Sequence, residues 1–317
     1  MAAGIVVVAY PLGRLVPLVG PPVLALALGI AVASARPPAA RLLPGINFTG
    51  KHVLQAAIVV LGATLSLSQV ARVGSSTLPV MVGTLAVALL IALLAGRLLG
   101  IDGRVRTLIG VGTGICGASA IAAISGIIEA TESEVAYAVS TIFVFNLVAV
   151  LLFPPLGHLL GLSQSAFGLW AGTAVNDTSS VVAASYAYGQ TAGTHAVLVK
   201  LTRTTMIVPV AAALALYSAR RSDRSNKTPW TRVVPWFLLW FLAAAALHTS
   251  GALPHVLNGA FQQLAVVLIT LALGAIGLST RLGDLRRAGP RPLLLGTLVW
   301  LGVATSSLVL QRLTGAW

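Results

Sequence analysis

Long apolar stretches alternate with short polar links along the chain. A helix rises about 1.5 Å per residue, so about 20 apolar residues cross a hydrocarbon core of about 30 Å. Membrane-spanning strands would instead alternate apolar and polar residues over about 10 positions, and the segments here lack that alternation. The pattern predicts eleven hydrophobic helical segments, at residues 4–18, 20–35, 52–69, 77–99, 106–128, 135–157, 165–187, 193–217, 233–249, 256–279 and 292–313.

Composition gives the same class of protein. Hydrophobic residues make up 57% of the 317 residues and charged residues only 9%, and the mean hydropathy is +0.95. Such a chain has too little polar surface to cover a soluble globule. We therefore expect an all-α polytopic membrane protein with about 9 to 11 transmembrane segments, forming a single transporter domain over residues 1–317.

The formal charge of +13 fits membrane topology better than nucleic-acid binding. The basic residues are spread over several interhelical loops and form no single stripe with aromatic residues between them, so no nucleic-acid partner is expected. Most of them follow the second, fourth, eighth and tenth segments. These even-numbered loops lie on one side, which the positive-inside rule makes cytoplasmic. The N-terminus is then cytoplasmic and the C-terminus external.

A first internal repeat relates the two ends of the chain. Residues 79–85 recur as 292–298, and Leu61-Gly62-Ala63 recurs about 212 residues later, so approximately 20–100 resembles 233–315. An offset of seven segments makes the copies run in opposite directions through the membrane, as in inverted-repeat secondary transporters. The alternative is chance, because Gly, Leu and Ala are common in this chain.

A second repeat lies in the middle of the chain. GTGICGASAIAAIS at 112–125 aligns with GTAVNDTSSVVAAS at 172–185, and both contain a polar break, near 112–119 and 172–180. Non-helical backbone at membrane depth is tolerated only where it is buried in protein or lines a cavity. Two full crossings would give eleven transmembrane segments, whereas two re-entrant hairpins would give nine. The sequence leaves both alternatives open.

Asp177 is the only one of the seven acidic residues that lies deep in an apolar segment. A carboxylate there is costly unless it is paired, hydrated or protonated, which makes it a functional-site hypothesis; the alternative is that it only ties two helices together. Facing breaks would aim helix N-termini at one centre. The candidate substrate- or ion-binding residues in the two breaks are Asn176, Asp177, Thr178, Ser179 and Thr173, with Thr113, Cys116 and Ser119 in the other copy.

Two cations in the eighth segment complete the candidate site. Lys200 and Arg203 are three residues apart and share one helix face. Paired with Asp177, they leave one surplus positive charge, which suits a small anion. A carboxylate that is protonated in one step and paired with a cation in another could couple proton movement to anion movement.

Other functional classes receive little support. Cys116 is the only cysteine, which excludes an internal disulfide and a CxxC metal or redox site, and a packing role suits it better than a nucleophilic one. The five His residues lie near predicted segment ends, and the chain has no Walker motif. We therefore expect neither enzymatic activity nor a cofactor or a metal site.

The long motifs GTGICGASAIAA, FGLWAGTAVNDTSSVVAASYAYG, VKLTRTTMIVPV and LGATLSLSQVARVG resemble those of the YeiH-type sulfate exporter family of bacterial membrane proteins. That family is grouped with the cation/proton antiporter and anion transporter clan. The resemblance implies an inverted-repeat fold with discontinuous helices near the midplane, a mobile core, a scaffold that often forms homodimers, and a location in the bacterial inner membrane.

The resemblance leaves two functions open. The first is a secondary active transporter that exports sulfate or a related sulfur oxyanion, with Asp177 as proton-linked switch and Lys200 and Arg203 as anion partners. The second is a sodium or potassium/proton antiporter, because Asn176-Asp177 resembles the Asn-Asp pair with which electroneutral antiporters of the clan bind their ion. Many members of the exporter family have His where this chain has Asn176, which argues against a His-based proton relay.

Overall fold

Helices make up all the regular secondary structure that is described. The computed structural model describes residues 1–15, 20–219, 236–279 and 289–316, and no strand occurs in these ranges. Five helical stretches there are long and apolar enough to cross a membrane, namely Leu67–Leu98, Glu132–Leu159, Gln190–Leu214, Asn258–Ser279 and Pro290–Thr314. Three shorter apolar helices accompany them, at Ala2–Gly13, Leu24–Ala35 and Trp236–Thr249. The predicted all-α membrane protein is confirmed at this level.

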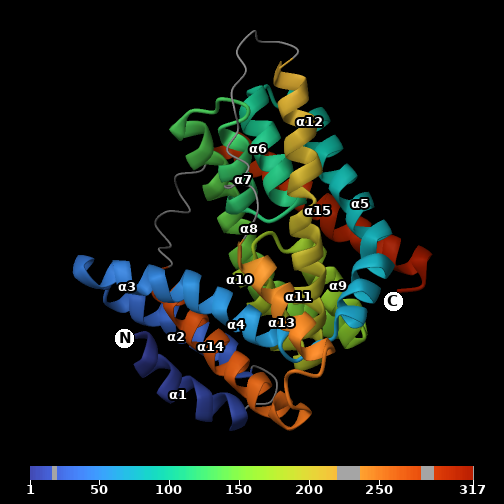
Figure 1. The fold of residues 1–317 in the computed structure, drawn as a ribbon. Helices are drawn as coiled ribbons and strands as arrows, with labels where there is room; N and C mark the ends of the chain where they lie inside the picture. The colour runs from blue at the N-terminus through green and yellow to red at the C-terminus, as the bar shows by residue number, and fades with distance from the viewer. Residues whose placement is uncertain (16–19, 220–235, 280–288, 317) are drawn as a thin grey trace.

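The helices form two groups (Figure 1). One group, in the lower part of Figure 1, comprises α1 (Ala2–Leu15), α2 (Gly20–Ala35), α3 (Leu43–Phe48), α4 (Leu54–Gly62), α13 (Trp236–Thr249) and α14 (Asn258–Ser279). The other comprises α5 (Leu67–Leu98), α6 (Gly103–Gly114), α7 (Ala118–Ser125), α8 (Glu132–Leu159), α9 (Gln164–Ala174), α10 (Thr178–Tyr188), α11 (Gln190–Thr205), α12 (Ile207–Ala219) and α15 (Pro290–Thr314).

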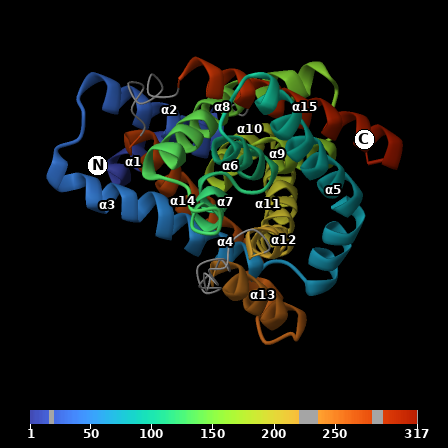
Figure 2. The same cartoon turned by 90° about the horizontal axis from the view of Figure 1, so that it is seen from above.

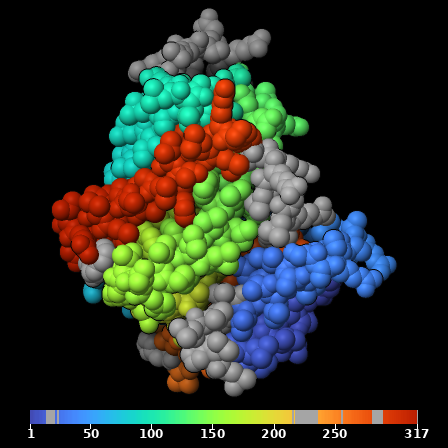
Figure 3. Space-filling view, turned by 180° about the vertical axis from the view of Figure 1, so that it is seen from behind, coloured from blue at the N-terminus to red at the C-terminus, as the bar shows by residue number. Residues whose placement is uncertain are grey.

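The two groups meet along α10 and α11. Val182 of α10 and Val197 of α11 share one buried cluster with Ile58 of α4 and Ile269 of α14. Seen from above, α6, α7, α9, α10 and α11 lie in the middle, between α5 and α15 on one side and α1, α3 and α14 on the other (Figure 2). From behind, the N-terminal helices form one block, and α15 crosses the other part of the molecule (Figure 3). These five helices of the second group therefore lie between the first group and the helices α5 and α15.

Glycines bring α2 and α14 into backbone contact. A Cβ on Gly29 would lie 2.6 Å from the carbonyl oxygen of Gly274, and one on Gly277 would lie 2.4 Å from the carbonyl oxygen of Leu26. Apolar burial drives helix association weakly in lipid, so helices there associate through close van der Waals packing at small residues. These glycines therefore fix the distance between α2 and α14.

The predicted segments correspond to helices, with three differences. The third, 52–69, is interrupted because α4 ends at Gly62 and α5 begins after Ser66, whose hydroxyl accepts from the Gln69 amide in a capping box. The eighth predicted segment divides into α11 and α12 at Met206. The fifth segment forms α6 and α7, and the seventh forms α9 and α10. Residues 233–235 and the basic loops at 220–232 and 281–287 lie outside the described residues.

The first internal repeat stays a prediction. Its two best-matching segments, α5 and α15, pack against each other, and a Cβ on Gly83 of α5 would lie 2.6 Å from Cδ1 of Leu310. That contact places the two segments side by side without relating them by symmetry.

Replacing Gly277 by Ala tests the close packing of α2 and α14. The added methyl group meets backbone atoms that cannot move aside, so the variant should lose about 1–3 kcal/mol of stability and melt at a lower temperature in detergent. Gly259→Ala in the same helix is the matched control, because nothing lies within 4 Å of a Cβ there. Equal melting temperatures for the two variants would contradict this packing.

Candidate functional site

The two aligned motifs fold into the same local structure. The α6 and α7 helices are joined by Ile115–Gly117, and the α9 and α10 helices by Val175–Asp177. The helix boundaries keep the offset of 60 residues seen in the alignment: α6 ends at Gly114 and α9 at Ala174. We call the joining residues the first tip, 115–117, and the second tip, 175–177.

Both helix pairs are hairpins. At the open end of the first, Nε of Arg104 donates to the carbonyl oxygen of Ile128 at 3.1 Å. At the open end of the second, the Tyr188 hydroxyl donates to the carbonyl oxygen of Leu162, and the Tyr188 ring stacks on Phe167 with centroids 3.9 Å apart. Each pair therefore ends close to where it began, and the choice between eleven crossings and nine crossings with two re-entrant hairpins stays a prediction.

The hairpins enter from opposite ends of α8, and their tips meet. The α8 helix begins just after the first hairpin and ends 28 residues later, just before the second, a rise of about 42 Å. A Cβ built on Gly117 would lie 3.3 Å from Cβ of Asp177. Gly117 also has φ +69° and ψ −132°, a conformation that glycine adopts readily. Glycine is required there for both reasons.

Lys200 of α11 ties the two tips together. Its Nζ donates to the carbonyl oxygen of Ile115 at 2.9 Å and to that of Val175 at 2.8 Å, which are equivalent positions of the repeat. These carbonyls follow the C-terminal ends of α6 and α9, where the helix dipole is negative. The Lys200 side chain is fully buried, with 0% exposure, and these two carbonyl oxygens accept its hydrogen bonds.

Arg203 binds the first hairpin alone. Its Nε donates to the carbonyl oxygen of Gly114 at 2.6 Å and its Nη2 to that of Thr113 at 3.4 Å, while Nη1 is buried without a partner. The predicted pairing of Asp177 with Lys200 or Arg203 is not found among the described residues. The free carbonyls at the ends of α6 and α9 attract the two cations instead.

Asp177 caps α10 through one of its two oxygens. Oδ2 accepts from the amides of Ser179 at 3.0 Å and Ser180 at 3.1 Å and from the Ser179 hydroxyl. Oδ1 is buried and has no partner. At the equivalent position Gly117 offers α7 no side-chain cap, and Ser119 beside it is exposed. The two helix N-termini at the centre thus differ in their caps.

Asn146 of α8 is a site residue that sequence reasoning missed. Its Oδ1 accepts from the backbone amides of Asn176 at 3.0 Å and Asp177 at 3.3 Å, so it satisfies the amides that the second tip leaves free. The side chain of Asn176 is fully buried, and neither its Oδ1 nor its Nδ2 has a partner. A lone Asn in the apolar run of α8 was the available signal.

The remaining predicted residues divide between the centre and the packing around it. Cys116 is buried in the first tip, and Thr178 is half-buried at the start of α10. Thr173 lies elsewhere: its hydroxyl is hydrogen-bonded to the carbonyl oxygen of Leu169 at 2.7 Å and lies 2.7 Å from Oγ of Ser307 in α15. The Thr173 side chain therefore ties α9 to α15 and does not reach the tips.

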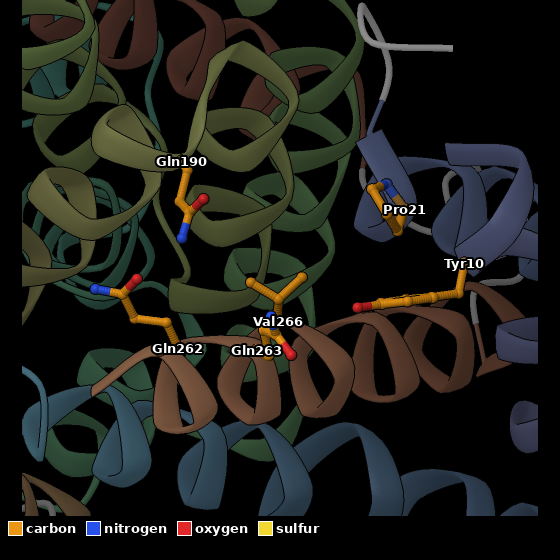
Figure 4. A pocket seen from close by; sticks show the side chains of 7 residues that line it. Tyr10, Pro21, Gln190, Gln262, Gln263 and Val266 are labelled. Carbon is orange, nitrogen blue, oxygen red and sulfur yellow. The ribbon is translucent and has the colours of Figure 1, made fainter. Parts of the chain in front are cut away.

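A separate cavity lies away from the tips. It measures about 330 Å³ and is lined by Tyr10, Pro21, Gln190, Gly259, Gln262, Gln263 and Val266 (Figure 4). Gln190 is at the start of α11, ten residues or about 15 Å along the helix from Lys200. The cavity therefore lies at the junction of the two helix groups and not at the charged centre.

Two opposed hairpins form a centre around buried charged side chains, in a protein with five described helical stretches long and apolar enough to cross a membrane. A family model described as "Conserved hypothetical protein 698" matches residues 1–296. The chain belongs to this family, whose curated members carry the name UPF0324 membrane protein.

Relatives match over nearly their full length. A UPF0324 membrane protein of Streptococcus agalactiae is 41% identical over 321 residues, covering 99% of this chain and 96% of that protein. One of Fusobacterium nucleatum is 39% identical over 327 residues, with 97% and 94% covered, and one of Clostridium tetani is 41% identical over 285 residues, with 86% and 83% covered. No solved structure matches the chain significantly. The printed names support a membrane location and specify no substrate.

Asn146→Leu should destabilise the second tip. The change keeps the approximate volume of the side chain but leaves two buried amides without an acceptor, at a cost of about 1–3 kcal/mol, which thermal unfolding in detergent measures. Thr141→Val in the same helix is the control, because the Thr141 hydroxyl bonds only the carbonyl oxygen of Tyr137 in its own helix. If Asn146→Leu melts no lower than Thr141→Val, Asn146 does not hold the tip.

Lys200→Met should loosen both tips and expose Cys116 to thiol reagents. Removing the ammonium group breaks two charge-assisted bonds of about 1.5–3 kcal/mol each, so the rate of Cys116 alkylation should rise roughly tenfold or more. Cys116 is the only cysteine, and labelling therefore reports this position alone. Lys51→Met, at an exposed position, should label at the wild-type rate, and an unchanged rate for Lys200→Met would refute the tie.

Proposed function

We propose that the protein is a secondary transporter that carries a small oxyanion of the sulfate type through the centre where the two tips meet. The observation that carries the proposal is the N-terminus of α7, where Gly117 supplies no side-chain cap and touches Asp177, the cap of α10. Helix N-termini bind anions through free backbone amides and the positive end of the helix dipole.

The repeat supports a specific binding position for the anion, at the start of α7. In the second hairpin, the amide and hydroxyl of Ser179 donate to the carboxylate of Asp177. Ser119 is the equivalent residue in the first hairpin, where Gly117 replaces the carboxylate. An oxyanion at the start of α7 takes the place that a second carboxylate would fill and accepts from the same donors.

The charge balance favours an anion as well. The dipoles of two helix N-termini and two helix C-termini at the centre approximately cancel. Lys200 and Arg203, both with 0% exposure, then leave one positive charge over that of Asp177. Buried charge without a counter-charge is costly, so a bound anion stabilises the centre. On this proposal the two cations supply charge through the tips and do not contact the anion directly.

The hairpins suit a carrier better than a static binding protein. Each reaches only about half-way through the membrane, since α6 has 12 residues and a length of about 18 Å. Irregular backbone from opposite sides then meets at mid-depth, which is the usual place of substrate in secondary transporters.

A sodium or potassium/proton antiporter is the second candidate. Oδ1 of Asp177 and Oδ1 of Asn176 are buried without partners, and oxygen ligands of this kind suit a hard cation. On this alternative the cation and a proton compete for Asp177, and anions play no part.

Thermal unfolding of the purified protein separates the candidates. Sodium sulfate should raise the melting temperature above that in sodium chloride of equal ionic strength, because a ligand at 100 times its Kd adds about 2.7 kcal/mol. Ser119→Asp should abolish the sulfate effect, since its carboxylate occupies the end of α7, while the neutral Ser119→Asn retains it. Counterflow of labelled sulfate in proteoliposomes should follow the same order.

One result of the same experiment would favour the antiporter. If the melting temperature depends on sodium or potassium but not on the anion, and Asp177→Asn removes that dependence, the antiporter is correct and the anion transporter is not.

A further inference from the structure

We infer that one exposed face of the helical stretch at residues 40–53 binds the headgroups of acidic phospholipids. This face, which we call the basic face, consists of Arg41, Phe48, Lys51 and His52, all of them exposed. It belongs to the first helix group and contains no residue of the two tips. The inference therefore does not rest on the proposed function.

The helical stretch packs on the rest of the protein along one side. It comprises the 3-10 turn η1 (Ala40–Leu42), α3 and the π-helical turn η2 (Thr49–Val53), and it continues without a break into α4. Ile46 is its one buried residue, and it lies in a cluster with Leu278 of α14. The side of the helix that carries Ile46 therefore faces α14.

Spacing and exposure place the basic face on the other side of the helix. Arg41 and Phe48 are seven residues apart. Lys51 and His52 follow Phe48 by three and four residues, and all these spacings share one face of a helix. Phe48 is two residues after Ile46, about half a turn, so it points away from α14. Its side chain is 58% exposed, and its ring stacks on His52 with centroids 4.6 Å apart. The face therefore carries an aromatic ring between two long basic side chains.

The basic face lies level with one end of a helix of membrane length. Gly50, beside Lys51, packs on α14, since a Cβ there would lie 3.0 Å from Cγ1 of Ile276. Ile276 is three residues before Ser279, where α14 ends. In two views α3 lies at the outer edge of the molecule (Figure 1, Figure 2). Lys51 is therefore at the depth where an apolar helix ends, which is the level of the lipid headgroups.

The first helix group has no acidic side chain to neutralise these charges. The first acidic residue of the chain is Asp102, and residues 236–279, which supply α13 and α14, contain neither Asp nor Glu. Among the described residues, no side chain forms an ion pair or a hydrogen bond with Arg41 or Lys51. A positive face without acidic neighbours attracts anions from outside the protein.

Acidic phospholipid supplies both the charge and the apolar surface that this face matches. Basic residues at the cytoplasmic ends of membrane helices attract acidic headgroups. The loop that holds Arg41 follows the second predicted segment, so the positive-inside rule predicts that it is cytoplasmic. Exposed aromatic rings favour the boundary between headgroups and acyl chains, which suits Phe48. A second copy of this face would instead bring like charges together.

Lipid binding to the purified full-length protein in detergent tests the inference. Phosphatidylglycerol should bind about tenfold or more tightly than zwitterionic phosphatidylcholine with the same acyl chains, as measured by native mass spectrometry. Replacing both cations, Arg41→Gln with Lys51→Gln, should weaken phosphatidylglycerol binding about 25-fold, because each charge contributes roughly a factor of five.

Arg72→Gln with Arg97→Gln is the matched control. Both arginines are exposed on α5, and this pair removes the same charge from the second helix group. Its affinity for phosphatidylglycerol should equal that of the wild type. Inorganic phosphate at the concentration of the lipid should not displace the lipid, because phosphate has no apolar part to pack on Phe48.

Four results would overturn the inference. Equal affinity for the two lipids removes the charge selectivity, and equal losses in the two double variants show that binding follows net charge and not this face. Displacement by inorganic phosphate identifies a free anion as the ligand. A dimer in the same spectra that is lost with Arg41→Gln and Lys51→Gln identifies a second copy as the occupant. The comparison of the two lipids on the wild type decides the matter even if a variant does not fold.

Discussion

The ammonium group of Lys200 holds the centre of the molecule together. Two hairpins each end in carbonyl groups that their own helices cannot satisfy, and a buried carbonyl group without a donor is costly. Lys200 reaches Ile115 and Val175 at once, which is possible only where the tips meet beside α11. A hydrogen bond from a charged donor is stronger than a neutral one, so one side chain fixes the depth of both hairpins. The cap of α10 and the contact between Gly117 and Asp177 both depend on that fixed geometry.

The two hairpins have equivalent backbones, but the N-termini of α7 and α10 are capped differently. The repeat provides two hairpins whose helices begin and end at equivalent residues, so the backbone supplies two N-termini to the same region. Asp177 neutralises one of them, and Gly117 leaves the other open. Two carboxylates would fill both ends and repel each other across a short contact. With glycine in the first tip, the tips approach closely, and the residue before α7 supplies no side-chain cap.

The sequence predicted which residues form the two tips but not the hydrogen-bond partners of the polar side chains there. The repeat at spacing 60 placed both tips correctly because glycine and short polar residues mark broken backbone. The pairing of Asp177 with Lys200 stays a prediction, because the hydrogen-bond partners of Nζ in this structure are backbone carbonyls, whose directions depend on hairpins that the sequence left open. The Ser66 and Gln69 capping box is a sequence signal for the break before α5. The leucines around it made the whole stretch look like one continuous hydrophobic segment. Asn146 has no local signal beyond its polarity, since its partners are about 30 residues away in sequence.

The two hairpins are held by different side chains. Trp170 of α9 stacks on Phe153 of α8, with centroids 4.1 Å apart, and donates from Nε1 to the carbonyl oxygen of Ala304 in α15, so the second hairpin is anchored on two sides. The first hairpin is held by Arg203 of α11, whose Nε and Nη2 donate to the carbonyl oxygens of Gly114 and Thr113. These bonds satisfy the C-terminal end of α6, whereas Gly117 supplies no side-chain cap to the N-terminal end of α7. Each hairpin is therefore fixed to a different set of neighbouring helices, and Lys200 is the side chain that bonds to both.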